Sequence, residues 1–232
     1  MTRKYILTVD GPAAAGKGSI SKAISTDLNL YYLETGLLYR MFAYKMLGKE
    51  FDKVQINEVG EELKENIFKF DLQSKSYLYN SEISELASKL AKELLVRKCI
   101  EGMQKNFLFS LPDTNRGIIL EGRDCGTVIA PNADLKIFLT ADVNERASRR
   151  FKQLSKKEKN LSYEKIYNDL LNRDARDKNR TLSPLRKAED AYLVDNTKYT
   201  FEETINIVKN IIFSKIPTLK INKKNNHIES GK

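Results

Sequence analysis

The chain has 232 residues and a net charge of +9, with 41% of its residues hydrophobic and 31% charged. This balance predicts a folded protein with a sizeable core, and no apolar run approaches the roughly 20 residues of a membrane span. Only two cysteines occur, Cys99 and Cys125, and they lack metal-ligand spacing, which suits a reducing cytoplasm without a disulfide framework.

The first predicted strand leads directly into a glycine-rich turn. Tyr5–Val9 is an apolar, β-branched run typical of a buried parallel strand, and the sequence GPAAAGKGS follows at residues 11–19. This strand–GxxxxGK–helix order is the P-loop pattern, in which several backbone N–H groups meet the oxygens of a phosphate group. We expect side chains at Gly11 and Gly16 to block that approach. The predicted helix Lys17–Leu28 points its positive N-terminus at the phosphates.

The P-loop pattern predicts a set of residues that bind ATP. The set comprises Gly11, Pro12, Ala13, Ala14, Ala15, Gly16, Lys17, Gly18 and Ser19. Lys17 is also a predicted catalytic residue because its charge reaches the β- and γ-phosphates. A glycine-rich turn that binds nothing is the alternative, which the lysine and the flanking strand and helix argue against. Gly18 stands where motor ATPases usually carry the hydroxyl that holds Mg²⁺, and the order GKGS instead resembles the nucleoside-monophosphate kinases.

A second strand is predicted at Leu30–Leu33, followed by a helix over Leu37–Leu47 that carries Arg40. Residues just past the carboxyl end of a strand lie in the ligand crevice of an open α/β sheet. Arg40 is therefore placed to bind a phosphate with its planar guanidinium. On position alone, an ordinary surface arginine is the alternative.

Residues 50–85 are predicted to be an insertion, because no Pro-, Gly- or Ser-rich linker separates them from the rest of the domain. The alternating run Lys75–Asn80 is compatible with a β ribbon. A helical pattern then continues over residues 81–107 and carries Ser88 and Arg97. From the pattern alone, these two residues are a surface hydroxyl and a solvated arginine.

A third strand, Gly117–Glu121, is followed by Arg123 and Asp124, and a fourth is predicted at Leu135–Thr140. An arginine and an acid at the carboxyl end of a strand beside the P-loop are candidates for phosphate binding and for base or sugar recognition. The alternative is a turn in which Arg123 and Asp124 cap each other. Cys125 is predicted to fill a small buried space rather than to act as a nucleophile.

Residues 145–180 are predicted to form a lid of two helices joined by a mobile, lysine-rich tip at Ser155–Asn160, with Ser162 capping the second helix. Each helix carries charged residues on one face: Arg146, Arg149 and Arg150 on the first, and Arg173, Asp177 and Arg180 on the second. Such a pair can close over a transferring phosphoryl group and exclude water. A solvated helix pair with ordinary surface ion pairs is the alternative.

A fifth strand at Ala191–Asp195 and a final helix at Thr200–Phe213 complete the predicted elements. Strands that alternate with helices predict an α/β fold, here a five-stranded parallel sheet with helices on both faces. We assign residues 1–214 to this P-loop kinase domain and residues 215–232 to a basic, disordered tail. The positive charge of the lid and the tail would also suit a nucleotide-dependent nucleic-acid-binding protein, but the basic stretches lack the interleaved aromatic residues that stack bases.

Five separated motifs together resemble those of the bacterial cytidylate kinases. They are DGPAAAGKGS at 10–19, ETGLLYR at 34–40, EGRDCGT at 121–127, NERASRR at 144–150 and RDARDKNR at 173–180. The resemblance runs from about residue 6 to residue 212. It implies a P-loop core with a lid and an inserted segment that closes over the monophosphate, and transfer of the γ-phosphoryl group of ATP to CMP or dCMP.

The resemblance also implies roles for individual residues. Those implied to bind ATP, besides the P-loop, are Arg149 and Arg150. Those implied to hold the acceptor phosphate are Arg40, Arg123 and Arg180, the last two also as catalytic residues. Those implied to recognise cytosine are Ser88, Arg97 and Asp124, with Thr35 nearby, and those implied to hold the ribose are Arg173 and Asp177.

Two departures from the family pattern concern acidic residues. The family more often has Asp-Ser-Gly where this chain has Glu34-Thr35-Gly36, and Asp where it has Glu121. We expect ATP as the phosphoryl donor and Mg²⁺ as cofactor, with no residue assigned as a direct metal ligand. We also expect a cytoplasmic monomer without nucleic-acid or membrane partners. A small P-loop kinase for adenylate or uridylate is the nearest alternative.

Overall fold

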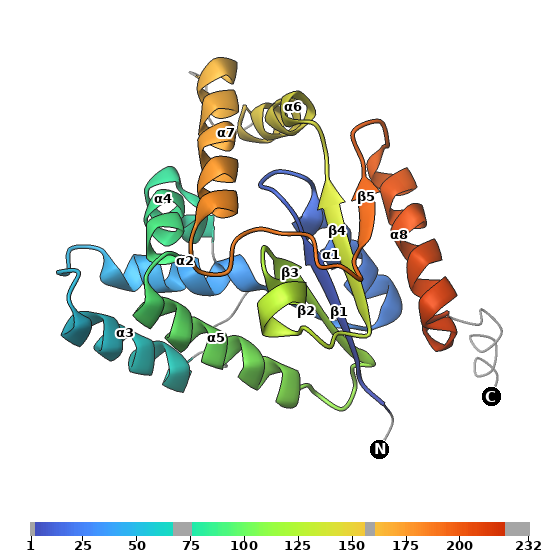
Figure 1. Ribbon diagram of the computed structural model, residues 1–232, viewed down its shortest axis with the longest axis horizontal. Helices are drawn as coiled ribbons and strands as arrows, with labels where there is room; N and C mark the ends of the chain where they lie inside the picture. The colour runs from blue at the N-terminus through green and yellow to red at the C-terminus, as the bar shows by residue number, and fades with distance from the viewer. Residues whose placement is uncertain (1–2, 67–75, 156–160, 221–232) are drawn as a thin grey trace, which may run out of the picture.

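The computed structural model describes residues 3–66, 76–155 and 161–220. A five-stranded sheet, all parallel in the order β2-β3-β1-β4-β5, runs through its centre (Figure 1). The strands are β1 (Tyr5–Asp10), β2 (Tyr31–Glu34), β3 (Gly117–Gly122), β4 (Leu135–Thr140) and β5 (Tyr192–Asp195). The five predicted strands and their parallel arrangement are therefore confirmed.

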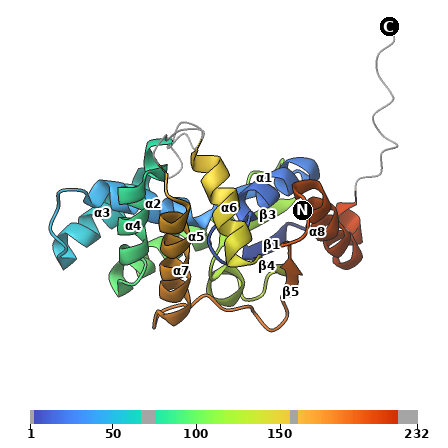
Figure 2. The same cartoon turned by 90° about the horizontal axis from the view of Figure 1, so that it is seen from above.

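Helices cover both faces of the sheet, as predicted. On β3, Ile118 and Leu120 pack into the cluster under one set of helices, whereas Ile119 between them packs into the cluster under the other set. The first set is α2 (Thr35–Met46), α3 (Lys53–Asn66), α4 (Ser81–Leu90) and α5 (Leu94–Phe109); the second is α1 (Lys17–Leu28) and α8 (Phe201–Lys215). Figure 2 shows the two sets on opposite sides of the strands.

The lid helices α6 (Val143–Leu154) and α7 (Tyr163–Asn179) lie together beyond the carboxyl ends of the strands (Figure 1). The side chain of Ser162 accepts a hydrogen bond from the Lys165 N–H, so the predicted cap is confirmed. A small cluster of Ala147, Ile166 and Leu170 packs against Ala13 of the P-loop. The helix pair is thus attached to the phosphate-binding turn by apolar contacts. The predicted mobile tip lies, after Ser155, outside the described residues.

The insertion differs from its prediction in two places. Within the described residues, Ser76–Tyr79 forms a short 3₁₀ helix and not a β ribbon, because Leu78 turns inward and is buried among α2 and α4. The long helical pattern is broken into α4 and α5. The break frees the carbonyl of Ala91, which accepts a hydrogen bond from Arg97 Nη1 at 3.1 Å.

The predicted tail begins later than expected. Helix α8 extends to Lys215, and Pro217–Leu219 forms a 3₁₀ turn against the sheet. Ile216 and Leu219 are buried, because their three-residue spacing places both apolar side chains on the inner side of the turn. The disorder predicted for the tail concerns mainly residues 221–232, which lie outside the described residues.

Among residues 3–66, 76–155 and 161–220, we find no helix of the length and apolar character that crossing a bilayer requires.

Candidate active site

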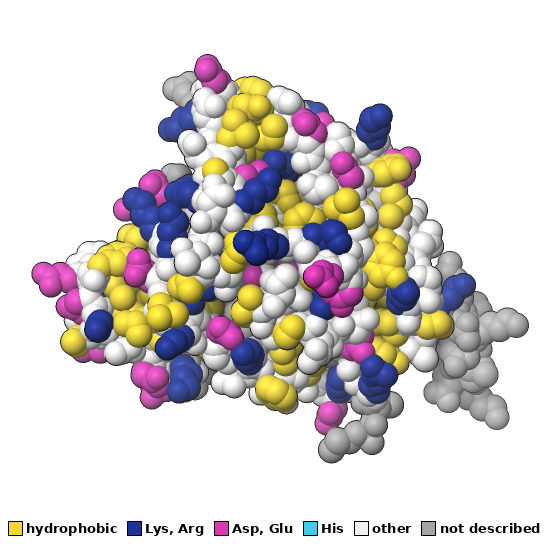
Figure 3. Space-filling model, viewed as in Figure 1, with side chains coloured by type: hydrophobic (Ala, Val, Ile, Leu, Met, Phe, Trp, Pro, Cys, Tyr) yellow, Lys and Arg dark blue, Asp and Glu magenta, His cyan; other side chains and the backbone are white. Residues whose placement is uncertain are grey.

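A cavity of about 760 Å³ lies between the carboxyl ends of the strands and the lid helices. Lys and Arg side chains gather around this hollow (Figure 3). The predicted site residues that line it are Ala13, Ala14, Gly16, Lys17, Gly18, Ser19, Thr35, Arg40, Ser88, Arg97, Arg123, Asp124, Arg149, Arg150, Arg173, Asp177 and Arg180. Those predicted for the site that do not line it are Gly11, Pro12 and Ala15.

Lys17 begins helix α1 and lies at the floor of the cavity. Its Nζ donates to the Pro12 carbonyl at 2.8 Å and lies 3.5 Å from Glu121 Oε1. Burial, together with the positive charge of Arg123, lowers the pKa of Lys17 to about 8. A buried ammonium with a lowered pKa gains when an anion approaches it, which is what a phosphate-binding lysine requires.

The backbone itself requires both motif glycines. A Cβ at Gly11 would lie 1.9 Å from the carbonyl oxygen of Leu139, so Gly11 allows the end of β1 to pass close to β4. A Cβ at Gly16 would meet only the Asn196 side chain at 3.7 Å. Gly16 is instead favoured because its φ is +88°. That side chains here would also block a bound phosphate stays a prediction.

Asp10, at the end of β1, connects the P-loop to the turn after β3. Its carboxylate accepts hydrogen bonds from the N–H groups of Cys125 and Gly126 at 2.9 and 2.7 Å. Burial raises the pKa of Asp10 to about 6. Cys125 is fully buried beside it, as predicted. Sequence reasoning missed Asp10, although its place at a strand end next to the P-loop was a usable signal.

One wall of the cavity holds a buried polar network. Arg97 and Asp124 form an ion pair with both side chains almost completely buried. Arg180 Nη2 lies 3.9 Å from Asp124 Oδ1 and has no hydrogen-bond partner, and Ser88 Oγ is also buried without one. The idea that Arg123 and Asp124 cap each other is wrong, because Asp124 pairs with Arg97. Unpaired buried polar atoms are costly, so this wall is built for a polar ligand.

Further guanidinium groups converge between this wall and the P-loop. Arg123 Nε donates to Asp177 Oδ2 at 2.9 Å, and Arg123 Nη1 donates to the Gly122 carbonyl at 3.0 Å. Arg173 Nε is buried without a hydrogen-bond partner. Burial and the charge of Arg123 lower the pKa of Arg173 to about 10. Positive charges held this close together favour a bound anion.

Arg40 is oriented by the insertion. Its Nη1 donates to the carbonyl of Leu78 and to the hydroxyl of Ser84, and its guanidinium lies 4.9 Å from the ring centre of Tyr79. The Tyr79 hydroxyl donates to Glu34 Oε2 at 2.7 Å. The 3₁₀ helix Ser76–Tyr79 therefore positions Arg40, although it lies far from the motif at residues 34–40 in the sequence.

Thr35 is placed differently from what a base contact would suggest. Its hydroxyl donates to the carbonyl of Glu121 at 2.8 Å, and the side chain is buried. The hydroxyl hydrogen of Thr35 is thus engaged in a hydrogen bond that connects α2 to the end of β3. A role of Thr35 in base recognition stays a prediction.

The lid arginines are held by protein groups. Arg146 donates to the carbonyls of Ala141 and Ala13 at 2.9 and 3.0 Å and lies 2.7 Å from Asp174 Oδ2. Arg146 is buried, and protein groups pair with its guanidinium. Arg150 Nη1 donates to Gln153 at 2.8 Å.

The end of the cavity next to α6 is closed by a segment that sequence reasoning missed. Its lining residues are Asn196, Tyr199, Thr200, Phe201 and Thr204. Arg149 donates to the side-chain oxygen and the carbonyl of Asn196 at 2.9 and 2.8 Å. The signal was available, since Asn196 directly follows β5 and residues at that edge of the sheet face the ligand crevice.

The sequence matches the family model described as cytidylate kinase over residues 7–214. A cytidylate kinase of Bartonella tribocorum is 37% identical over 213 residues, which cover 90% of this chain and 95% of that protein. One of Thermosipho africanus is 35% identical over 221 residues, with the same coverages of 90% and 95%. The solved structure of TT1252 from Thermus thermophilus has a TM-score of 0.50 at 16% identity, covering 92% of this chain and 98% of that one, which supports the fold alone.

Proposed function

Because the chain belongs to the cytidylate kinase family, we propose that its cavity binds ATP and a cytidine monophosphate end to end. The enzyme transfers the γ-phosphoryl group of ATP to CMP or dCMP, giving ADP and CDP or dCDP. The observation that carries the assignment of the acceptor end is the buried Arg97–Asp124 pair with unpaired polar atoms of Ser88 and Arg180 beside it.

The donor end of the proposed site is the P-loop. Residues 11–19 would surround the ATP phosphates with backbone N–H groups, and Lys17 would bind the β- and γ-phosphates. Arg149 and Arg150 lie on the lid side of the same end of the cavity. Its far wall, formed by Tyr199 and Phe201, supplies apolar surface for the nucleoside part of ATP.

The acceptor end would hold the monophosphate with Arg40, Arg123 and Arg180. Arg173 and Asp177 are one turn apart on α7, beside Arg123, and would contact the ribose. The charges of Arg123 and Arg173 act on Lys17, and Arg180 lies 3.9 Å from Asp124 of the base-binding wall. A monophosphate bound to them therefore points its oxygens toward the donor phosphates.

Cytosine fits the polar wall by its pattern of donors and acceptors. The carboxylate of Asp124 accepts from the exocyclic amine, while Arg97 and Ser88 donate to N3 and O2. Uracil presents a carbonyl in place of the amine and an N–H at N3. Mispaired buried polar groups cost about 1–3 kcal/mol each, so the wall discriminates against uracil.

The reaction needs alignment and charge stabilisation more than proton transfer. A phosphate monoester has a second pKa of about 6, so the acceptor oxygen is already largely ionised at neutral pH and needs no general base. Lys17, Arg123 and Arg180 would stabilise the charge on the moving phosphoryl group. The lid helices exclude water, which would otherwise compete as acceptor.

Mg²⁺ fits the acidic residues beside the P-loop. Glu34 and Glu121 are register partners on β2 and β3, and burial together with the charge of Glu121 raises the pKa of Glu34. Mg²⁺ usually keeps several waters and takes one or two carboxylates plus substrate phosphates, so no closed cage of protein ligands is needed. Glu34, Glu121 and the hydroxyl of Ser19 would hold it, and when bound it neutralises phosphate charge.

A coupled assay of ADP release with CMP, dCMP, UMP and AMP tests the proposed acceptor site. We expect kcat/KM for CMP to exceed that for UMP by about one to three orders of magnitude. Asp124→Asn should narrow this gap, because an amide can also donate to the uracil carbonyl. Equal rates with UMP or AMP in the wild type would show that Ser88, Arg97 and Asp124 do not form the base pocket.

The chain is further proposed to act as a cytoplasmic monomer without a nucleic-acid partner. Light scattering of the purified protein with and without substrates tests the oligomeric state. A stable dimer at assay concentrations would contradict it.

A further inference from the structure

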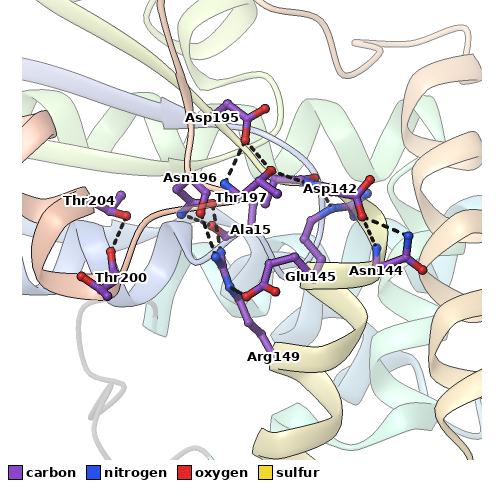
Figure 4. Close-up of polar contacts among 12 residues, drawn as sticks. Ala15, Asp142, Asn144, Glu145, Arg149, Asp195, Asn196, Thr197, Thr200 and Thr204 are labelled. Carbon is purple, nitrogen blue, oxygen red and sulfur yellow. Dashed lines mark hydrogen bonds and ion pairs between the residues drawn. The ribbon is translucent and has the colours of Figure 1, made fainter.

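Two carbonyl groups of the P-loop are held by side chains from outside it. Arg146 of α6 donates from Nη1 to the Ala13 carbonyl at 3.0 Å, and Asn196, which follows β5, donates from Nδ2 to the Ala15 carbonyl at 3.1 Å. Figure 4 shows Asn196 between Ala15 and Arg149. Both donors are buried, with 5% and 3% of Arg146 and Asn196 exposed.

Holding these carbonyls fixes the direction of the N–H groups that follow them. In a trans peptide the C=O and the next N–H point in opposite directions, and no cis bond occurs among the described residues. The N–H groups of Ala14 and Gly16 must therefore point away from Arg146 and Asn196. Ala14 and Gly16 line the cavity, whereas Ala15 between them does not.

The same two residues have unusual backbone angles. Ala14 has a φ of +59° and Gly16 a φ of +88°. For alanine the left-handed region costs about 1–2 kcal/mol, and such a conformation persists only where surrounding contacts impose it. Left-handed residues alternating with ordinary ones form a concave nest of N–H groups that binds anions. The hydrogen bonds from Arg146 and Asn196 are the contacts that impose it here.

We infer that Asn196 is a positioning residue of the phosphate-binding turn, acting together with Arg146. Its amide nitrogen turns the Ala15 carbonyl outward, and its amide oxygen accepts from Arg149 at 2.9 Å. The Asn196 side chain thus orients both the Ala15 carbonyl of the turn and the guanidinium of Arg149 in the lid. This inference rests on the proposed role of residues 11–19 in binding the donor phosphates.

Binding of inorganic tripolyphosphate, measured by calorimetry, tests the inference separately from turnover. Asn196→Leu keeps the size of the side chain but removes the donor and the acceptor. Asn196→Asp keeps an acceptor for Arg149 and removes the donor to Ala15, but it also adds a negative charge, so its tripolyphosphate affinity is compared at low and high salt. Since each variant loses at least the hydrogen bond to Ala15, we expect both to bind tripolyphosphate at least about threefold to tenfold more weakly. KM for ATP should rise by a similar factor, with KM for CMP nearly unchanged.

Thr197→Ala is the matched control for loss of structure in the same turn. The Thr197 hydroxyl contacts Asp195 and the N–H of Asp142 but no atom of the P-loop (Figure 4). We expect this variant to lower Tm without changing tripolyphosphate affinity. If Asn196→Leu fails to fold, Asn196→Asp decides the question at high salt, where the repulsion from its added charge is screened.

A double variant distinguishes the contact of Asn196 with the P-loop from its contact with the lid arginine Arg149. In Arg149→Met, the Asn196→Leu change should still weaken tripolyphosphate binding, because the contact with Ala15 is independent of Arg149. Loss of the effect in that background, or wild-type affinity in both Asn196 variants, would overturn the inference. Failure of the wild type to phosphorylate CMP would instead count against the proposed function. The tripolyphosphate measurements would still test whether Asn196 positions the phosphate-binding turn.

Discussion

At the scale of single residues, Lys17 couples phosphate binding to pH. Its pKa is lowered to about 8 by burial, and a polyanion beside it raises that pKa again. The complex with ATP therefore keeps a proton that the free enzyme loses above pH 8. We expect ATP affinity to be constant between pH 7 and 8 and to fall by up to about tenfold per unit above it.

Titration calorimetry of ATP binding from pH 7 to 9.5 measures this dependence. Lys17→Met is the control, since it removes the titrating group. It should bind ATP weakly with no such slope, and its kcat should fall by about two to three orders of magnitude or more. A steep slope that persists in Lys17→Met would assign the pH dependence to another group.

Residues of the site differ in how far the sequence could predict them. The P-loop pattern predicted Lys17. Arg123 and Asp124 directly follow a buried strand, so the edge of a parallel sheet alone made them candidates. Ser88 and Arg97 are on helices whose pattern is that of a solvated surface, and only resemblance to a family indicated them. Their burial depends on how α4 and α5 pack against α2 and the turn after β3, which is a tertiary property that no local pattern contains.

At the scale of elements, the lid helices differ in how firmly they are held. The first turn of α6 is anchored by Arg146 on the Ala13 carbonyl. Arg173 in the last turns of α7 and Arg180 directly after the helix instead carry buried, unpaired guanidinium atoms. A bound monophosphate would satisfy these atoms, so we expect ligand to stabilise α7 near its C-terminal end and to leave the start of α6 unchanged.

Hydrogen exchange with CMP alone, with a non-hydrolysable ATP analogue alone and with both measures this difference. CMP alone should slow exchange over residues 173–180 by about tenfold, the factor expected of one charge-assisted hydrogen bond worth ~1.4 kcal/mol. Residues 143–147 should exchange equally in all states. Equal slowing across α6 and α7 would contradict the anchoring role of Arg146 and indicate a lid that moves as one body.

The prediction of secondary structure failed where packing, and not the local sequence pattern, determines the conformation. Strands such as Leu135–Thr140 were predicted to the residue because a buried parallel strand is a continuous apolar run bounded by polar turns. The alternation over Lys75–Asn80 is equally compatible with a turn, and the burial of Leu78 selected a 3₁₀ helix. The break between α4 and α5 leaves no mark in the periodicity, since apolar positions recur on both sides of it.

At the scale of the whole molecule, the site is assembled from segments far apart in the chain. Arg40, Arg123 and Arg149 each come from a region close behind the carboxyl end of a different strand: β2, β3 and β4. The parallel order of the strands brings these ends to one edge. The positive charge of the chain is thereby concentrated around one cavity, while apolar clusters on both faces of the sheet keep the edge in place.

The C-terminal end of the described chain contributes to that support. Ile216 and Leu219 are buried in the cluster under α1 and α8, and Arg116 donates to the carbonyls of Thr218 and Leu219. We therefore expect a chain that ends at Lys215 to lose about 3–5 kcal/mol of unfolding free energy, from two buried aliphatic side chains and their hydrogen bonds. A chain that ends at Lys220 keeps all these contacts and should lose little. Urea unfolding of both truncations and the full chain measures the difference, and equal stability of the two truncations would show that the 3₁₀ turn contributes nothing to the fold.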